Sequence, residues 1–274
     1  MKYYLIAGEA SGDLHGSNLM KGILKADPGA RFRFWGGDKM AAVGGAENLA
    51  MHYEKASFMG FTEVLKNLRT IFGQIEQCKR DVAAYAPDVL VLIDYAGFNL
   101  RLARFGRERG IPTYYYIAPK VWAWKESRVK KIRRWVDRLF VIFPFEVEYF
   151  RRRGIEAIYE GNPLMDAIDA RRAALGSKEE FRAVHGLDGR PVVACLAGSR
   201  RSEIGYNLPF MVELSGRFPQ YQFVVAGVPW LDRSVYEPLI AGSPVRYVCD
   251  ATYELLAHRF LQKESMRTGL KITD

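Results

Sequence analysis

The first candidate for catalysis, Asp94, directly follows an unbroken apolar run, Val89–Ile93. Five apolar residues in a row are typical of a parallel strand that is buried on both faces. A carboxylate at the tip of such a strand is held rigidly and is partly shielded from water, which suits a general base that takes a proton from a sugar or other hydroxyl group. The other use of Asp94 would be to cap a helix over Leu100–Arg109, a role that Asn99 fills more naturally.

A second candidate loop, Gly8-Glu-Ala-Ser-Gly-Asp13, follows the apolar run Tyr3–Ala7. Its glycines allow a ligand to approach the backbone closely. Ser11 and Asp13 can hydrogen-bond a hydroxylated ligand, but they can equally cap the next helix. Glu9 is harder to explain as a cap, because it stands immediately at the strand end.

The third loop, Gly198-Ser-Arg-Arg-Ser-Glu203, follows the apolar run Val192–Ala197. Small residues at a helix start turn backbone N–H groups towards an anion, and Arg200 can bind two phosphate oxygens at once. The loop therefore predicts phosphate recognition, although an ordinary exposed loop would look similar. It is neither a Walker motif nor the Gly-x-Gly-x-x-Gly motif of dinucleotide enzymes.

Composition limits the class of protein. The chain has 274 residues, of which 49% are hydrophobic and 26% charged, so we expect a packed core and about two domains. The histidines and cysteines lack metal-ligand spacing, so no metal or other cofactor is expected, and the cysteines are expected to be reduced and buried. We find neither a signal peptide nor an apolar run long enough to span a membrane, which predicts a cytoplasmic protein.

A basic and aromatic stretch, Lys120–Arg153, contains eleven basic and four acidic residues and so carries most of the net charge of +9. Several Trp, Phe and Tyr residues are interleaved with these charges. The mixture suits an anionic partner with an apolar part as well as it suits a nucleic acid. A solvated helix face beside core aromatic residues is the simpler alternative.

Short apolar runs alternate with helical patterns, which predicts parallel sheets covered on both faces, a Rossmann-like architecture. The expected strands of the first part are Tyr3–Ala7, Arg31–Trp35, Val89–Ile93, Thr113–Ile117, Leu139–Phe143 and Ala157–Tyr159, and the expected helices are Leu14–Lys25, Val64–Tyr85, Leu100–Arg109 and Arg128–Val136. After Pro191 the pattern restarts with strands Val192–Ala197, Gln222–Ala226 and Val245–Val248 and a helix near Pro209–Arg217. We place two domains at residues 1–165 and 166–274. Since a doubly wound domain usually has five or six strands, the second is expected to be incomplete.

Six segments together resemble the lipid-A-disaccharide synthase family, in order and spacing, from about residue 3 to about residue 257. They are Ala7–Asp13, Met59–Leu65, Ile93–Asn99, Pro119–Trp124, Gly161–Pro163 and Leu196–Arg200. The resemblance implies an inverting, metal-free glycosyltransferase of the two-domain GT-B type. Its members join UDP-2,3-diacylglucosamine to 2,3-diacylglucosamine 1-phosphate and release UDP, in the lipid A biosynthesis of Gram-negative bacteria.

The resemblance also implies roles for individual residues. Asp94 would deprotonate the acceptor 6-hydroxyl, Glu9 would position the acceptor, and Arg200 would bind a substrate phosphate. The remaining substrate-binding candidates are Gly8, Ser11, Gly12, Asp13, Asn99, Trp122, Trp124, Asn162, Gly198, Ser199 and Glu203. Phe58, Met59 and Phe61 would contact acyl chains or the membrane, unless they are a partly buried helix start.

The implied partners are acylated glucosamine phosphates, a UDP-sugar and the anionic surface of the inner membrane, to which the protein would attach peripherally, with no nucleic acid. A homodimer is compatible with the resemblance.

Several positions depart from the family pattern. Ala96 and Ala197 stand where proline is usual, and Asn162 stands where many members carry histidine. Residues 258–274 do not match the expected continuation, which includes part of the UDP site, so we expect a truncated donor domain. The alternatives are therefore a non-catalytic fragment that binds acylated sugar phosphate or membrane, and another GT-B enzyme that acts on UDP-sugars.

Overall fold

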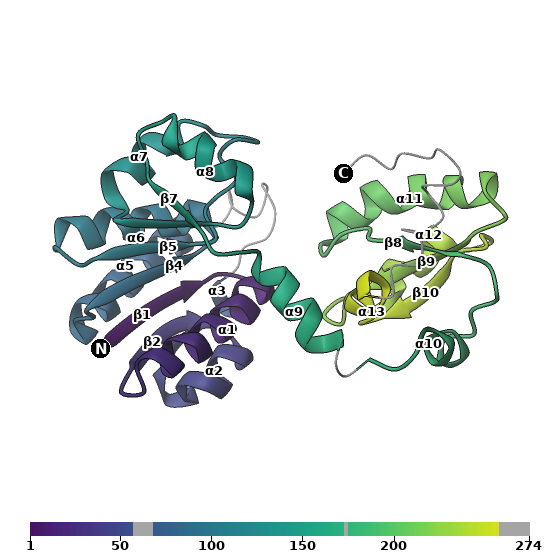
Figure 1. The fold of residues 1–274 in the computed structure, drawn as a ribbon, viewed down its shortest axis with the longest axis horizontal. Coiled ribbons are helices and arrows are strands. Elements are labelled where there is room, and N and C mark those ends of the chain that lie inside the picture. Colours follow the sequence, from purple (N-terminus) through teal and green to yellow (C-terminus); the bar gives the residue numbers. More distant parts are fainter. Residues whose placement is uncertain (57–67, 173–174, 258–274) are drawn as a thin grey trace. The chain divides into compact units, whose positions relative to one another are not determined.

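A computed structural model describes residues 1–56, 68–172 and 175–257 (Figure 1). The chain divides into two compact units, Met1–Pro163 and Leu164–Asp274. The boundary that we expected at residue 165 falls inside the helix α9 (Pro163–Arg172), which begins the second unit.

The first unit is built on a parallel sheet of seven strands in the order β3-β2-β1-β4-β5-β6-β7. The strands are β1 (Lys2–Ala7), β2 (Arg31–Gly36), β3 (Leu49–His52), β4 (Val89–Ile93), β5 (Thr113–Tyr116), β6 (Arg138–Val141) and β7 (Ala157–Tyr159). Six of them match expected apolar runs. The edge strand β3 was missed, because its four residues are only partly buried and none of them is β-branched or one of the aromatic residues Phe, Tyr and Trp that favour strands. This sheet confirms the predicted α/β fold class.

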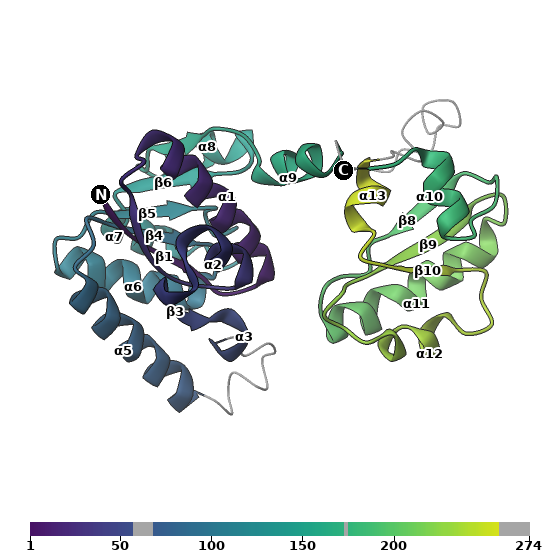
Figure 2. The same ribbon diagram turned by 90° about the horizontal axis from the view of Figure 1, so that it is seen from below.

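Helices cover both faces of this sheet (Figures 1 and 2). Within β1, Tyr4 and Ile6 join a core shared with α5 to α8, while Leu5 and Ala7 join a core shared with α1 and α2. A strand buried on both faces needs apolar residues at every position, which explains the unbroken runs in the sequence. The helical elements are α1 (Ala10–Ala26), α2 (Asp38–Gly44), the 3₁₀ turn η1 (Ala46–Asn48), α3 (Tyr53–Ala56), α5 (Leu68–Tyr85), α6 (Ala96–Glu108), α7 (Arg128–Trp135) and α8 (Pro144–Arg151).

The strand order reverses between β1 and β4, which lie side by side with Ala7 opposite Ile93. From β1 the chain continues outwards to β2 and β3, and then returns to start the other half of the sheet at β4. The connections on the two sides of this point diverge, so a crevice forms at the carboxyl ends of the two strands. The loops that follow β1 and β4 therefore meet where ligands bind in folds of this kind.

The second unit has a parallel sheet in the order β10-β9-β8 among the described residues. Its strands are β8 (Val192–Cys195), β9 (Gln222–Gly227) and β10 (Arg246–Cys249), and its other elements are α10 (Lys178–Val184), α11 (Arg201–Arg217), η2 (Arg233–Val235), α12 (Glu237–Ile240) and α13 (Thr252–Ala257). One face packs against Phe181 and Leu255, and the other against Ile204 and Leu208. The helix expected near Pro209–Arg217 begins earlier, at Arg201, and contains Pro209 in its interior.

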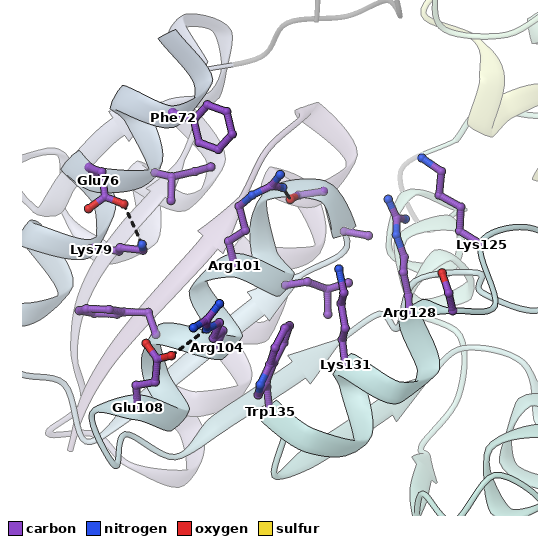
Figure 3. Close-up of a pocket in the computed structure, with 16 residues that line it drawn as sticks. Phe72, Glu76, Lys79, Arg101, Arg104, Glu108, Lys125, Arg128, Lys131 and Trp135 are labelled. Carbon is purple, nitrogen blue, oxygen red and sulfur yellow. Dashed lines mark hydrogen bonds and ion pairs between the residues drawn. The ribbon is translucent and has the colours of Figure 1, made fainter. Parts of the chain in front are cut away.

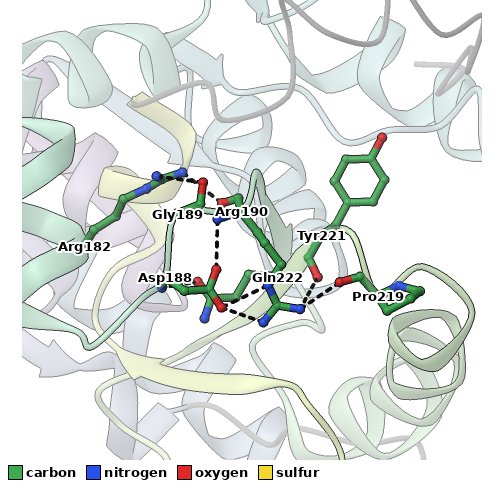
Figure 4. A network of polar contacts seen from close by, with 7 residues as sticks. All are labelled: Arg182, Asp188, Gly189, Arg190, Pro219, Tyr221 and Gln222. Atoms are coloured by element: carbon green, nitrogen blue, oxygen red, sulfur yellow. Dashed lines mark hydrogen bonds and ion pairs between the residues drawn. The ribbon is translucent and has the colours of Figure 1, made fainter.

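Arg190 fastens the amino end of this second sheet (Figure 4). Its guanidinium donates to a carboxylate oxygen of Asp188 (2.6 Å) and to the carbonyl of Pro219 (2.8 Å), at the turn before β9. The backbone N–H of Asp188 donates in turn to the side chain of Gln222, which is 2% exposed. These contacts join the segments that enter β8 and β9. They lie at the end of the sheet opposite to the Gly198–Glu203 loop.

The three cysteines differ in exposure, and one of our expectations is wrong. Cys78 and Cys195 are buried, but Cys249, at the end of the edge strand β10, is exposed. Burial raises the pKa of Cys195 to about 12 and raises the pKa of Cys78 further above its ordinary range. Both buried thiols are therefore protonated at neutral pH.

We expect one of the three thiols to react rapidly with a disulfide reagent at pH 8 in the native protein, and all three after unfolding, because the thiolate is the reactive form. The measurement is the time course of thiol labelling. In Cys249→Ser the fast phase should disappear, and a fast phase that survives this substitution would show that a buried thiol is accessible.

Candidate functional site

Asp94 lies on a sharp turn between β4 and α6. Both Asp94 (φ 41°) and Tyr95 (φ 45°) have left-handed backbone, which residues other than glycine rarely adopt. The carbonyl oxygen of Asp94 accepts hydrogen bonds from the Tyr115 hydroxyl (2.6 Å) and from Nδ2 of Asn99 (2.9 Å). Burial raises the pKa of Tyr115 well above its ordinary value, and the Asp94 carboxylate raises it further. Two uncharged donors, Tyr115 and Asn99, thus hold the turn, and its half-buried aspartate stands at the end of β4.

Asn99 supports this turn and does not cap a helix as we expected, whereas its assignment as a substrate contact stays a prediction. It lies inside α6 and is completely buried. Its amide nitrogen donates to the carbonyl oxygens of Ile93 (3.1 Å) and Ile6 (3.4 Å) as well as to that of Asp94. One side chain therefore joins the ends of β1 and β4.

Gly8 allows the two loops to pack together. A Cβ atom at this position would lie 2.3 Å from Cγ of Tyr95, so only glycine leaves room for the aromatic ring. The ring also stacks on Phe98, with 5.3 Å between the centroids. Burial raises the pKa of Tyr95, and the negative charge of Glu9 adds to that rise. Glu9 and Asp94 therefore approach the same tyrosine from neighbouring strand ends.

Glu9 and Ser11 form a pair at the start of α1. The Ser11 hydroxyl donates to Oε1 of Glu9 (2.9 Å). Glu9 occupies the N-cap position, but its side chain makes no capping hydrogen bond. Ser11 thus orients a half-buried carboxylate that the helix end does not use.

Gly12 and Asp13 have structural roles, and their assignment as substrate contacts stays a prediction. Asp13 is 3% exposed, and its carboxylate accepts hydrogen bonds from the backbone N–H groups of Gly37 (2.7 Å), Lys39 (3.0 Å) and Met40 (3.0 Å). Asp13 therefore caps α2, although it belongs to another helix. That helix, α1, begins at Ala10, so residues that we expected to form a loop are helical. A Cβ atom at Gly12 would lie 3.1 Å from that of Ala7, so this glycine lets α1 pack closely on β1.

A hollow of about 380 Å³ brings Asp94 together with Lys120, Trp124 and Arg128. Trp124 is 58% exposed, and its ring lies under Lys125 (4.5 Å to the centroid) and Arg128 (5.1 Å). The sequence indicated the basic stretch, but not that Lys120 and Arg128 would face the aspartate. Their position follows from the course of the chain after β5, which no local pattern reveals.

Trp122 belongs to an exposed aromatic cluster with Phe143 and Phe145 at the ends of β5 and β6. Its indole N–H donates to Oε1 of Glu146 (2.8 Å), which is 1% exposed. The second oxygen of Glu146 accepts the N–H groups of Ile142 (3.1 Å) and Phe143 (3.0 Å). A buried carboxylate thus fixes Trp122 while 39% of that tryptophan stays exposed.

In the second unit, the Gly198–Glu203 loop folds around its own carboxylate. Glu203 accepts hydrogen bonds from the backbone N–H groups of Ser199 (2.8 Å) and Arg200 (3.2 Å). These are the groups that we expected to face a bound anion. Trp230, which the sequence did not single out, donates its indole N–H to the carbonyl of Ser199 (3.1 Å). Arg200 is exposed and lies 3.6 Å from Glu203.

The remaining candidates from the sequence are Asn162 and the three residues Phe58, Met59 and Phe61. Asn162 is half-buried between β7 and α9, whereas Phe58, Met59 and Phe61 lie outside the described residues. Across residues 1–56, 68–172 and 175–257, no group of three or more His, Cys, Asp or Glu side chains is arranged to hold a metal ion. Within the same ranges, no helix is long and apolar enough to cross a membrane.

Parallel sheets between layers of helices, with candidate residues at a reversal of strand order, define a Rossmann-like protein of the GT-B type. Among solved structures, the chain is similar to UDP-GlcNAc 2-epimerase from Neisseria meningitidis bound to UDP-GlcNAc, with a TM-score of 0.64 at 12% identity over 90% of this chain and 72% of that one. It is also similar to sucrose-phosphate synthase from Thermosynechococcus elongatus, with a TM-score of 0.55 at 15% identity over 94% and 72%. At such identities the likeness concerns the fold alone.

The sequence comparison identifies the family. Residues 3–253 match the family model for lipid-A-disaccharide synthetase, and the chain belongs to this family. The lipid-A-disaccharide synthases of Geobacter metallireducens and Geobacter sulfurreducens are each 39% identical over 259 residues, which is 92% of this chain. The chain spans 66% of the length of each of these relatives.

The role of Asp13 is testable. Asp13→Ala should lower the free energy of unfolding by about 1–3 kcal/mol, because three backbone N–H groups, two of them buried, lose their acceptor. Asp38→Ala is the matched control, since Asp38 is in the first turn of the same helix but its side chain is 99% exposed. Urea unfolding measures both variants, and equal effects would contradict a special role for Asp13.

Proposed function

We propose that this chain is a hexosyltransferase of lipid A synthesis, which transfers the diacylglucosaminyl group of UDP-2,3-diacylglucosamine to the 6-hydroxyl of 2,3-diacylglucosamine 1-phosphate. Membership of the family supports the reaction class. The observation that carries the proposal is Asp94, held on a fixed turn at the end of β4 and facing a hollow that Lys120 and Arg128 make positive. A base beside cationic groups suits a hydroxyl nucleophile whose molecule also carries a phosphate.

In this proposal Asp94 takes the proton of the acceptor 6-hydroxyl as its oxygen attacks the anomeric carbon of the donor. The bond from that carbon to UDP breaks on the opposite face, UDP leaves with the bonding electrons, and the configuration inverts. Glu9, oriented by Ser11, would hydrogen-bond the acceptor sugar. Arg200 would offset the growing negative charge of the departing diphosphate, with its partner Glu203 moving aside. These steps require no metal and no organic cofactor.

The same proposal gives the exposed aromatic residues a use. Trp124 and Phe145 are 58% and 52% exposed. Exposed aromatic rings suit the headgroup region of a bilayer. We therefore propose peripheral attachment to the cytoplasmic side of the inner membrane, with Phe58, Met59 and Phe61 adding acyl contacts. A homodimer remains a prediction.

The test is UDP release from UDP-2,3-diacylglucosamine and the 1-phosphate acceptor, in neutral detergent. Asp94→Asn keeps the shape of the side chain but removes its basicity, so we expect the rate to fall at least about 100-fold. Asp38→Asn, far along the chain and exposed, should leave the rate unchanged.

Other outcomes favour the alternatives. A folded protein that binds the acceptor without releasing UDP would be a non-catalytic fragment. Conversion of non-acylated UDP-sugars would indicate a different GT-B enzyme. Steeply salt-dependent binding to DNA, without binding to anionic vesicles, would indicate a nucleic-acid partner.

A further inference from the structure

A groove of about 740 Å³ runs between α5, α6 and α7 of the first unit (Figure 3). Six cationic side chains and two carboxylates line it, which gives the groove a net charge of +4. Its walls also carry apolar groups, among them Phe72, Phe105 and Trp135. The volume lies within the range of ordinary small-molecule sites.

The cations of this groove fall into two sets. Lys79 pairs with Glu76 (2.7 Å), and Arg104 pairs with Glu108 (2.7 Å). In contrast, Arg101, Lys125, Arg128 and Lys131 form no ion pair with any carboxylate in the described part of the chain, and Figure 3 shows their side chains around one end of the groove. Cations without a carboxylate partner raise each other's free energy where they gather, so this end of the groove favours a bound anion.

This cationic end adjoins the hollow that Asp94 lines. The groove and the hollow share Ala96, Gly97 and Arg128. The candidate base and the cluster of cations therefore line neighbouring cavities. The two parts are joined by the first turn of α6, which follows the Asp94–Tyr95 turn directly.

We propose that the cationic end of the groove, formed by Arg101, Lys125, Arg128 and Lys131, binds the phosphate of the acceptor sugar. The inference rests on the proposed function and names the subsite that selects the acceptor. A phosphate monoester carries between one and two negative charges near pH 7, and arginine can bind two of its oxygens at once. A concave surface favours a discrete phosphate over a flat bilayer, which would meet protruding residues first.

The experiment compares two ligands in micelles of neutral detergent, 2,3-diacylglucosamine 1-phosphate and the same molecule without its phosphate. Binding is measured by isothermal titration calorimetry, so it does not depend on turnover. We expect the full chain to bind the phosphorylated ligand at least 10-fold more tightly. The double variant Arg128→Gln/Lys131→Gln should lose this preference and bind the two ligands within about 3-fold of each other.

The matched control is Lys130→Gln/Arg133→Gln, which removes the same charge from α7 but at residues that line a different hollow. This control should keep the 10-fold preference, and thermal unfolding of both variants checks that they are folded. Equal binding of the two ligands by the unchanged chain would overturn the inference. So would a preference that survives in the Arg128/Lys131 variant, or one that the control loses equally.

A membrane role is distinguished by a further arm with vesicles of phosphatidylglycerol. If the Arg128/Lys131 variant loses vesicle binding but keeps its preference for the phosphorylated ligand, the groove serves the bilayer and the inference is wrong. The proposed function fails separately, through the absence of UDP release by the unchanged chain.

Discussion

The left-handed turn at Asp94 and Tyr95 is the constraint on which the site depends. Such backbone costs on the order of 1–3 kcal/mol at each residue other than glycine, so neighbouring contacts must hold it. Hydrogen bonds from Tyr115 and Asn99 to the Asp94 carbonyl do so, and Gly8 leaves the space that the Tyr95 ring fills. The turn fixes the aspartate at the end of β4. It also sets the direction of α6, whose first residues, Ala96 and Gly97, line both the hollow and the groove.

The carboxylates near the strand ends divide by the partners of their oxygens. Asp13, Glu146 and Glu203 all accept backbone N–H groups, and the first two are almost completely buried. Each thereby holds a loop or a helix end in place, as a strong acceptor does when it satisfies otherwise unpaired donors. Asp94 and Glu9 are half-buried and stand at the adjoining carboxyl ends of β4 and β1. In the proposed function, acidic residues therefore both build the site and supply its chemistry.

Most of the first sheet could be predicted because strands buried on both faces leave unbroken apolar runs. Prediction failed where that signal is weak. The edge strand β3 is short and only partly buried, and α2 depends on a cap from Asp13, which is 24 or more residues away in sequence. The start of α1 was placed too late, because Ser11, Gly12 and Asp13 look like a loop although they form its first turn. The exposure of Cys249 was likewise missed, because the residues around it in the sequence do not reveal it.

The sequence by itself determined the α/β architecture and the family, because strand periodicity and motif spacing are local along the chain. It also singled out Asp94, Glu9 and Arg200 as candidate chemical groups, and their roles remain predictions. Only the tertiary structure decided which polar side chains hydrogen-bond the backbone and so support the fold, and which cations lie in the hollow with Asp94. The supporting roles of Asn99 and Asp13 became visible only once their backbone partners were known. Lys120 and Arg128 meet Asp94 because parallel strands bring distant loops to one edge of the sheet, and that convergence depends on the order of strands in space.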